Sequence, residues 1–318
     1  MSREVHVRFR ESPGVRLPRA TRLLREGERV KYAFIQAQEV AFPVQAMCQV
    51  LNVSRSGYYA WKERPSVDVE TVALSAEIAA AHKRSRGTYG SPRIHRELRA
   101  RGIRTSRKRV ERLMREKRLK GAQKRRFHCT TDSRHSLPIA PNTLNRAFDP
   151  PAADRIWAGD VTYIATEEGW LYLAVMLDLF SRRVVGWSVS TSNDTALASE
   201  ALKRALVARR PEAGLLHHTD RGSPYAGLAY TAILRQYGIV ASMSRAGDCY
   251  DNAVVESFFG TLKAELVRGC IYPSRAVATA AVRDYIENFY NTQRRHSHLQ
   301  YLSPIEFELR SQAAAFAS

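Results

Sequence analysis

The sequence has no segment that could cross a membrane or act as a secretion signal. Its best apolar candidate, LYLAVMLDLF, is much shorter than the ~20 residues that a membrane-spanning helix needs, and Asp178 interrupts it. The N-terminus has no apolar stretch of the kind found in signal peptides. We therefore expect a cytoplasmic protein with no membrane partner.

Cysteine is also scarce. Only four cysteines occur in 318 residues, and no two of them form a C-x-x-C pair. The wide spacing of Cys48, Cys129, Cys249 and Cys270 argues against a disulfide framework and against a structural zinc site. Hydrophobic residues make up 44% of the chain, which is enough to form the cores of two or three domains.

Acidic residues are few compared with basic ones, and the imbalance is local. The chain has 50 Lys or Arg and 31 Asp or Glu, a net charge of +19. Between Lys83 and Arg126 there are 19 basic residues and three acidic ones, so this segment alone carries +16. Such a concentration favours nucleic-acid binding, because neutralised phosphates release their counterions.

The basic segment has the start and stop signals of two consecutive helices. Ser91 is a candidate N-cap, Pro92 suits a first helical turn, and Gly102 suits the position after a helix end. A short turn then leads to Ser106, the candidate N-cap of the second helix. Two helices joined in this way predict a helix-turn-helix, whose second helix can enter the major groove of DNA.

The second helix has one apolar and one basic face. The apolar face consists of Val110, Leu113 and Met114, which we expect to point inward. A basic helical hairpin with a purely structural role is the alternative. On the DNA-binding interpretation, the candidate DNA contacts are Arg107, Lys108, Arg109, Arg112 and Arg115.

The chain after residue 155 changes character. Three segments rich in β-branched and aromatic residues, IWAGDVTYIAT, WLYLAVMLDLF and RVVGWSVS, predict consecutive antiparallel strands. Two more strands, GLLHHTD and IVASMS, alternate with helices. We expect Trp157, Tyr163 and Trp187 to lie in the core. The fold class is therefore α/β, a mixed five-stranded sheet flanked by helices and preceded by an all-helical region.

The domain boundaries follow from these patterns. We expect an uncertain basic extension over residues 1–30, a small module of three short helices over 31–65, a helix-turn-helix-like DNA-binding domain over 66–126, a linker over 127–150, a catalytic core over 151–312 and a tail over 313–318.

Three acids stand at informative places in the core. Asp160 lies in an otherwise apolar strand, an unfavourable position for a charge that nothing compensates. Asp220 ends the fourth strand, and Glu256 follows 36 positions later, on a predicted helix for which Asp251 or Asn252 is the candidate N-cap. Lys263, seven residues further, returns to nearly the same helix face as Glu256.

These acids and their surroundings carry a family resemblance. The segments are WAGDVTYI, HTDRGSPYA, GDCYDNAVVESFFGTLKAEL and YNTQRRHSHLQYLSPIEF. With them the chain resembles the DDE transposases and integrases of the ribonuclease-H-like class, and within these the second-frame (OrfB-type) product of insertion sequences of the IS-three group. The resemblance runs from about residue 31 to about residue 310.

The resemblance implies a metal-dependent chemistry. Asp160, Asp220 and Glu256 would hold two Mg²⁺ ions, which Mn²⁺ could replace, with Asp160 bridging both. Two such ions stabilise the entering and leaving oxygens of a phosphodiester displacement. Lys263 would contact a DNA phosphate, while Asp178 and His218 would lie behind the ligands or serve the fold.

The resemblance also implies partners. It suggests double-stranded DNA, as terminal inverted repeats and as target, a homo-oligomer on DNA, an upstream-frame helix-turn-helix protein or a fusion with it, and a bacterial, nucleoid-associated location. Two other functions remain open: a structure-selective nuclease or resolvase of the same fold, and an inactive DNA-binding regulator.

Overall fold

The computed structural model describes residues 26–63, 69–123, 138–245, 249–267 and 269–316. The chain separates into two compact units, and the boundary falls between Leu74 and Ser75, inside helix α5 (Val69–Arg84). Most of the predicted extension (1–30), the first part of the predicted linker and the last residues of the predicted tail lie outside the described residues.

The first unit contains three short helices, as the breaks in its sequence predict. They are α2 (Glu28–Gln38), α3 (Val44–Val50) and α4 (Arg55–Lys62). Ser54 caps α4, since its hydroxyl accepts a hydrogen bond from the backbone of Gly57 at 3.2 Å. The helices enclose a small core of buried side chains, which are Tyr32, Ile35, Met47, Cys48, Leu51 and Tyr58.

The second unit begins with the predicted helix-turn-helix. Helices α6 (Ser91–Ala100) and α7 (Arg107–Glu116) follow α5. Ser106 caps α7, accepting from the backbone N–H of Arg109 at 3.1 Å. The prediction that Ser91 caps α6 is wrong, because Gly90 occupies the cap position and no side chain caps this helix. The buried face is apolar as predicted, with Val110, Leu113 and Met114 inside.

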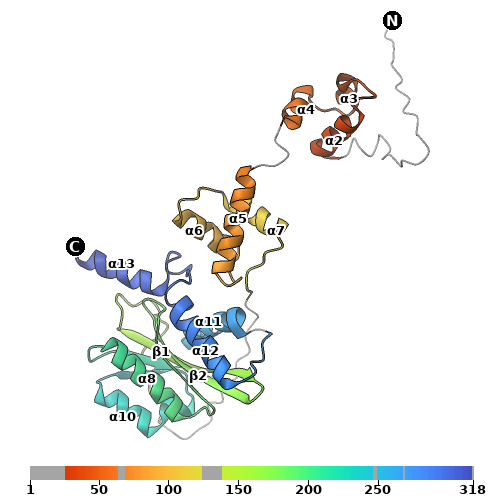
Figure 1. The fold of residues 1–318 in the computed structure, drawn as a ribbon. Coiled ribbons are helices and arrows are strands. Elements are labelled where there is room, and N and C mark those ends of the chain that lie inside the picture. The colour runs from red at the N-terminus through yellow and green to blue at the C-terminus, as the bar shows by residue number, and fades with distance from the viewer. Residues whose placement is uncertain (1–25, 64–68, 124–137, 246–248, 268, 317–318) are drawn as a thin grey trace. The chain divides into compact units, whose positions relative to one another are not determined.

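A mixed five-stranded sheet forms the centre of the second unit, as predicted (Figure 1). Its strand order is β3-β2-β1-β4-β5. Strands β1 (Ile156–Thr166), β2 (Gly169–Asp178) and β3 (Val184–Ser190) pair antiparallel. Strands β4 (Leu216–Thr219) and β5 (Val240–Met243) continue the sheet in parallel with β1.

One face of the sheet is covered by α8 (Thr195–Arg209) and α10 (Leu228–Gln236), with the short α9 (Ser223–Ala226) beside them. Helix α8 approaches β3 closely because Gly186 has no side chain, and a Cβ there would collide with the carbonyl oxygen of Ala201. The main hydrophobic core fills this interface, where Trp157, Ala174 and Met176 of the sheet meet the two helices.

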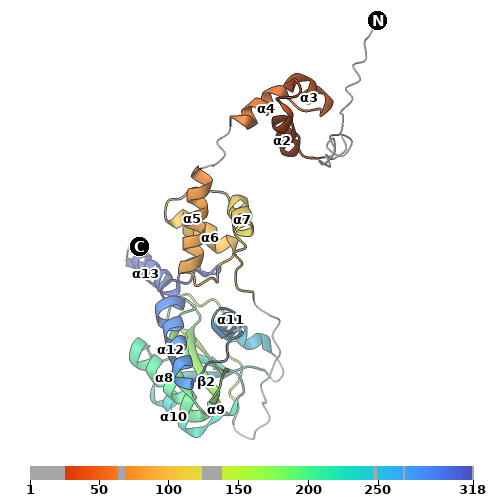
Figure 2. The same cartoon turned by 45° about the vertical axis from the view of Figure 1, so that its right-hand side comes forward.

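The other helices include α11 (Ala253–Leu262) and α12 (Arg275–Arg283), which pack on strands β1 and β2 (Figures 1 and 2). The 3₁₀ turn η1 (Cys249–Asn252) precedes α11, and π-helical turns η2 (Lys263–Val267) and η3 (Asp284–Tyr290) continue α11 and α12. Asn252 is at the N-cap of α11 but makes no side-chain cap, so the predicted capping bond is absent. Within the described ranges, no helix is long and apolar enough to cross a membrane.

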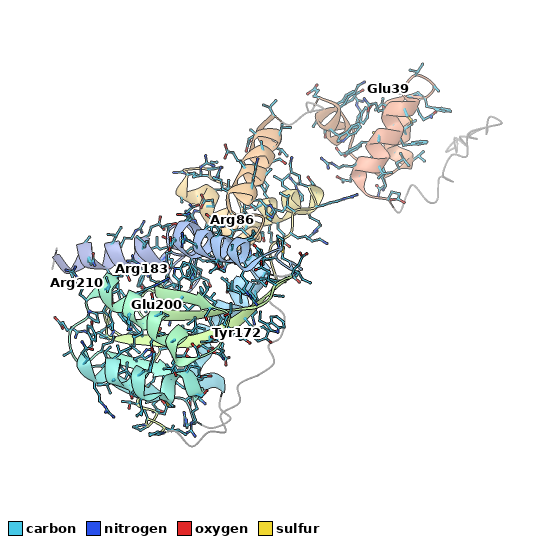
Figure 3. The ribbon with its side chains drawn as sticks, turned by 60° about the horizontal axis from the view of Figure 1, so that its bottom comes forward. Glu39, Arg86, Tyr172, Arg183, Glu200 and Arg210 are labelled. Carbon is cyan, nitrogen blue, oxygen red and sulfur yellow. The ribbon has the colours of Figure 1, made fainter. Side chains whose placement is uncertain are left out.

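Helix α13 (Pro304–Phe316) ends the described chain and runs past residue 312, where we expected the core to end. Glu308 docks it, with its carboxylate 2.7 Å from Arg183 and 2.9 Å from Arg209. Figure 3 labels Arg183, one of the two arginines that contact this carboxylate. Ser181 adds a hydrogen bond of 2.7 Å to the same carboxylate, which is 5% exposed. These contacts explain why the C-terminal segment belongs to the core.

Two further predictions from the sequence differ from the structure. The described part of the predicted linker, residues 138–150, packs on the sheet: Leu144 is buried, and the hydroxyl of Ser242 accepts from its N–H at 3.1 Å. Tyr163 is 42% exposed, so the prediction that it lies in the core is wrong, whereas Trp157 and Trp187 are buried as predicted. Tyr163 lies on the part of β1 that extends beyond its pairing with β4, where less protein covers the strand.

Candidate active site

The sheet register puts Asp160 and Asp220 on neighbouring strands. Strand β4 runs parallel to β1 with Thr219 opposite Gly159, so Asp220, which follows the end of β4, comes next to Asp160. Neighbouring strands are about 4.8 Å apart. The β4 pairing therefore sets two acids at the same level at the carboxyl end of β4.

Glu256 reaches the same region from helix α11. Asp160 lies opposite Val175 of β2, so the two side chains point to the same sheet face, which is not the face that holds Trp157 and Met176. Helix α11 packs on β1. Its start is anchored by a long hydrogen bond of 3.4 Å from the amide of Asn252 to the carbonyl of Gly159. Glu256 is in the first turn after this anchor.

Mutual electrostatic effects show that the three acids are close together. Burial raises the pKa of Asp160 well above its usual value, and the charges of Asp220 and Glu256 raise it further. Burial also raises the pKa of Glu256, and the charge of Asp220 adds to this effect. A hydrogen bond of 2.7 Å from Val161 N–H to Oδ1 of Asp160 acts in the opposite direction. The cluster therefore favours any cation that compensates its charge.

Lys263 is the positive neighbour of this cluster. Burial lowers the pKa of Lys263, and the charge of Asp160 offsets part of this effect. The charge of Lys263 acts to lower the pKa of Asp160, although burial and the other two acids raise it overall. The ammonium group also lies 4.7 Å from the ring centroid of the exposed Tyr163, a cation–π contact. Lys263 is the first residue of the π-helical turn η2, so α11 itself ends one residue before it.

Tyr225 is a site residue that the sequence reasoning missed. Its side chain is buried, and its hydroxyl has no hydrogen-bond partner within the described structure. Burial raises its pKa well above the usual value, followed by the charges of Asp160 and Asp220. A protonated hydroxyl close to two carboxylates is a donor available to them or to a bound phosphate. The only signal for this residue in the sequence was that it follows Asp220 closely in the HTDRGSPYA segment.

Asp178 and His218 are held by neighbouring parts of the fold. The carboxylate of Asp178 is buried and accepts hydrogen bonds of 2.8 Å from two backbone N–H groups, that of Asp154 before β1 and that of Ser181 in the β2–β3 turn. His218 lies between the hydroxyls of Ser242 and Ser244, at 2.9 and 3.1 Å. Burial lowers its pKa to about 4, so it is neutral near pH 7. These contacts give both side chains a structural role.

Asp251 has a role that the sequence did not indicate. Instead of capping α11, its buried carboxylate accepts from Arg245 Nε at 3.0 Å, Arg146 Nε at 3.1 Å and Asn142 Nδ2 at 2.7 Å. Hydrogen bonds from Arg245 are the main cause that lowers the pKa of Asp251. The residue joins the segment before β1 to the start of α11, and so fixes the entry of the helix that carries Glu256.

The three acids have the chemistry of a site for hard divalent cations, since carboxylate oxygens are the preferred ligands of Mg²⁺. Among the described residues, no group of three His, Cys, Asp or Glu side chains is already positioned to hold a metal ion. One oxygen of each aspartate accepts from backbone, Asp160 from Val161 and Asp220 from Gly222 at 2.9 Å. The negative charge that the three acids share fits a bound cation.

The raised pKa of Asp160 leads to a stability prediction. Folding favours the protonated form of this carboxyl, so ionisation costs stability at neutral pH and the cost disappears as the pH falls below the raised pKa. We expect Asp160→Asn to raise the free energy of unfolding by roughly 1 kcal/mol at pH 7 without divalent cations, or Tm by about 2–4 °C. Partial solvent access limits the gain.

Thermal unfolding with chelator at pH 7 and at pH 4 measures this effect. The gain should shrink at the lower pH, because the wild-type carboxyl is then largely protonated. Glu200→Gln, which removes an exposed acid on α8, is the control and should change Tm little at either pH. A lower Tm for Asp160→Asn at pH 7 would contradict the electrostatic interpretation.

The basic residues of α7 lie mainly on its exposed side. Arg107, Lys108, Arg112 and Arg115 are exposed, and Arg109 is half-buried. Arg112 pairs with Glu116 at 3.7 Å, and Arg115 with Glu111 at 3.3 Å. Exposed pairs of this kind stabilise a helix by only about 0.3–0.5 kcal/mol, so a phosphate could displace either acid.

Family models match two parts of the chain. Residues 150–249 and 256–311 match two models described as integrase core domain, and residues 70–127 match a model described as HTH-like domain. The chain is 48% identical over 263 residues to the "Insertion element IS600 uncharacterized 31 kDa protein" of Shigella sonnei, covering 82% of this chain and 97% of that protein.

A second relative is the "Transposase InsF for insertion sequence IS3A" of Escherichia coli. It is 42% identical over 289 residues, which cover 89% of this chain and 100% of the relative. Among solved structures, the catalytic core domain of HTLV-2 integrase in complex with magnesium aligns with 50% of this chain and 98% of its own, at 19% identity and a TM-score of 0.38.

The fold and the family matches define an integrase-core protein, a polynucleotidyl transferase with an HTH-like domain before the core. Identity over nearly the full length of its relatives then specifies the family. The chain belongs to the transposases of IS3-type insertion sequences, and it functions in DNA transposition.

Proposed function

We propose that Asp160, Asp220 and Glu256 would hold two Mg²⁺ ions, which Mn²⁺ could replace. When bound, the ions supply the positive charge that stabilises an in-line displacement at a DNA phosphate. The observation that carries the proposal is the adjacent register of β1 and β4, which brings two acids together beneath the helix that holds the third.

The protein's own side chains would then position the DNA. Lys263, next to Asp160, holds a phosphate near the reacting end, and the aromatic ring of Tyr163 limits the directions that its ammonium group can take. The hydroxyl of Tyr225 remains protonated and can donate to Asp160 or Asp220, which reduces their mutual repulsion. With water as the nucleophile the site cleaves an element end, and with a DNA 3′-hydroxyl it joins two strands.

A strand-transfer assay with a labelled element-end duplex and a 3′-hydroxyl donor tests the proposal. Cleavage and joining in Mg²⁺ are the expected result. Cleavage without joining would favour a structure-selective nuclease or resolvase, and binding without either reaction would favour an inactive regulator. The transposase relatives support the first outcome.

We also propose that the protein binds the terminal inverted repeats and the target as double-stranded DNA, as a homo-oligomer, with an upstream-frame helix-turn-helix protein or in fusion with it. The matched HTH-like domain and its basic helix α7 support the DNA-binding role of residues 66–126. A bacterial cytoplasmic location, at the nucleoid when DNA is bound, is consistent with bacterial relatives and a DNA substrate.

The role of α7 leads to a prediction about salt dependence. We expect Arg107→Ala or Lys108→Ala, if the residue contacts a phosphate, to weaken binding to all sequences and to lower the slope of log affinity against log salt by about one. Loss of a base contact would instead cost roughly 1–3 kcal/mol on the element end only.

Binding isotherms of the full chain on element-end and random duplexes, measured over a salt series, distinguish these effects. Arg235→Ala removes an exposed arginine from α10 in the catalytic core, and it should leave both affinity and slope nearly unchanged. If every α7 variant behaved like this control, α7 would not be the DNA-contacting helix.

A further inference from the structure

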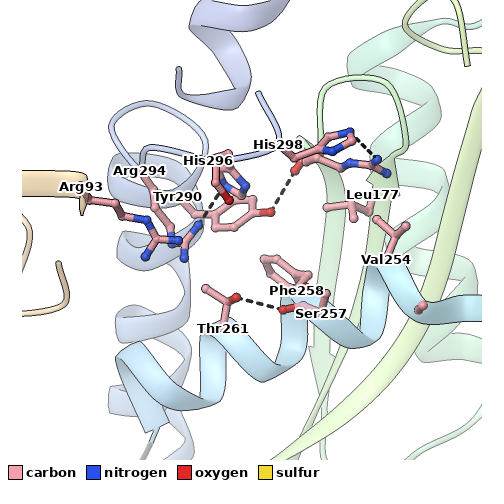
Figure 4. A pocket seen from close by; sticks show the side chains of 13 residues that line it. Arg93, Leu177, Val254, Ser257, Phe258, Thr261, Tyr290, Arg294, His296 and His298 are labelled. Carbon is pink, nitrogen blue, oxygen red and sulfur yellow. Dashed lines mark hydrogen bonds between the residues drawn. The ribbon is translucent and has the colours of Figure 1, made fainter. Parts of the chain in front are cut away.

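A basic cleft lies beside α11 and encloses about 300 Å³ (Figure 4). Residues of α6, of the β2–β3 turn, of α11 and of the segment after η3 line it, and among these described residues none is Asp or Glu. On a 3.6-residue helix, Ser257 and Thr261 lie about 100° and 140° around the axis from Glu256. The cleft and the three acids therefore lie on different sides of one helix. Its charged and imidazole residues are Arg93, Arg182, Arg294, His296 and His298.

The YNTQRRHSH segment, which the active site does not use, builds this cleft. Tyr290 donates its hydroxyl hydrogen bond to the carbonyl of Arg182 at 3.0 Å. The amide side chain of Asn291 bonds both the N–H and the carbonyl of Val184, each at 3.0 Å. These contacts hold the β2–β3 turn, in which Arg182 has a left-handed backbone with φ 59°. The segment thus fixes the turn that presents Arg182 and supplies His298 itself.

Arg182 is buried and has unused hydrogen-bonding capacity. Its side chain is 9% exposed, its Nη2 lies 2.9 Å from the exposed carboxylate of Asp149 and 2.8 Å from Nε2 of His298, and its Nη1 has no partner within the described structure. Burial is the main cause that lowers its pKa. The orphaned Nη1 is itself closed to solvent, so Arg182 contributes to the cleft mainly through its positive charge.

Two more guanidinium groups share one acid. Arg294 makes a bidentate pair with Glu265, at 2.8 and 2.7 Å, and Arg93 lies 3.6 Å from the same carboxylate. Burial lowers the pKa of Arg93, and the charge of Arg294 lowers it further. Among the described residues, the ion pairs of the three cleft arginines involve two acids, Glu265 and Asp149, and the charge of Asp178 also acts on Arg182.

We propose that this basic cleft binds a phosphate of the DNA backbone that does not itself react. The inference rests on the proposed function, because it takes the DNA strand to lie across α11 from the three acids. A helix is about 10–12 Å wide with its side chains, and phosphates of one strand follow one another every 3.4 Å along the DNA axis. A phosphate roughly three nucleotides from the reacting bond can therefore reach the cleft, where planar guanidinium groups suit its oxygens.

The test measures binding in Asp160→Asn protein, so that catalysis does not enter. Ser257→Glu introduces a carboxylate at the cleft, and Arg182→Gln removes the charge that carries the orphaned donor. Each should weaken binding of an element-end duplex about tenfold or more and lower the salt slope by about one. Gln236→Glu, the same charge change on exposed α10, should keep both values, and Ser257→Gln should lose less affinity than Ser257→Glu.

A second arm uses inorganic phosphate against chloride at equal ionic strength. Phosphate should raise the Tm of the parent protein and of Gln236→Glu more than that of Ser257→Glu. A phosphate effect with unchanged DNA slopes in both cleft variants would mean a site for free phosphate and would overturn the proposal. Unchanged slopes and no phosphate effect would also overturn it. Failure of the proposed function is detected separately. If the protein with Asp160 intact bound DNA but neither cleaved nor joined it, the proposed function would fail. The salt slopes measured in the Asp160→Asn protein would still test whether the cleft binds a DNA phosphate.

Discussion

Asp160→Asn, Asp220→Asn and Glu256→Gln are each expected to slow DNA cleavage and joining by at least about a thousandfold. Each substitution removes a charged ligand from a shared cation site, and a loss of about 4 kcal/mol of transition-state stabilisation corresponds to that factor. Binding of element-end DNA should stay nearly intact, because in our proposal the basic helix α7 and the basic cleft supply most phosphate contacts. Gel assays with end-labelled duplex in Mg²⁺ measure both reactions.

The amide variants preserve the size of each side chain, and Glu200→Gln on α8 is the matched control for loss of one carboxylate. Chelation of divalent cations should abolish activity of the wild-type protein, and added Mg²⁺ should restore it. Strand transfer at near wild-type rate by any of the three variants would remove that residue from the proposed site.

Glu265→Gln is expected to destabilise the second unit by about 3–5 kcal/mol, the range for breaking a buried ion pair by removing one partner. Glu265 and Arg294 are 4% and 3% exposed. Burial acts to lower the pKa of Arg294, but the hydrogen bonds and charge of Glu265 outweigh this and raise it overall. Without the carboxylate, Arg294 is left charged and buried, and the single oxygen of glutamine cannot accept all the hydrogen bonds that Arg294 and Tyr285 donate to Glu265.

Urea unfolding followed by tryptophan fluorescence measures this loss, since three tryptophans lie in the sheet. Glu77→Gln is the control: its pair with Arg101 is about 40% exposed on both sides, and its loss should cost less than about 1 kcal/mol. A similar, small effect of both substitutions would show that the η2 ion pair does not stabilise the fold.

Much of the architecture could be predicted because local patterns and packing agree. Segments rich in β-branched and aromatic residues predict β1 to β3, and the cap at Ser106 begins α7 where the sequence indicates. The acids were recognisable for a related reason: Asp160 in an apolar strand conflicts with burial unless function requires it. Such a conflict can be seen in the sequence without knowing which residues pack around Asp160 in the fold.

Other features depend on contacts between distant parts of the chain. Asp251 was a plausible helix cap by its local sequence, but Asn142 and Arg146, more than 100 positions away, take its carboxylate instead. Tyr163 has the composition of a core residue, yet β4 is too short to pair along that part of β1. Local sequence propensity contains no information about the distant partners of Asp251 or about the length of β4.

The sequence by itself determined the class of fold, the HTH-like region and the family, and it singled out three acids as candidates, because periodicity, caps, charge density and motif spacing are properties of neighbouring residues. Only the tertiary structure decided that Asp160 and Asp220 share a level of the sheet, that Tyr225 lies beside them, and that the YNTQRRHSH segment shapes a basic cleft around Arg182. The reason is physical: strand register, burial and the pairing of charges are settled by packing between segments far apart in the chain.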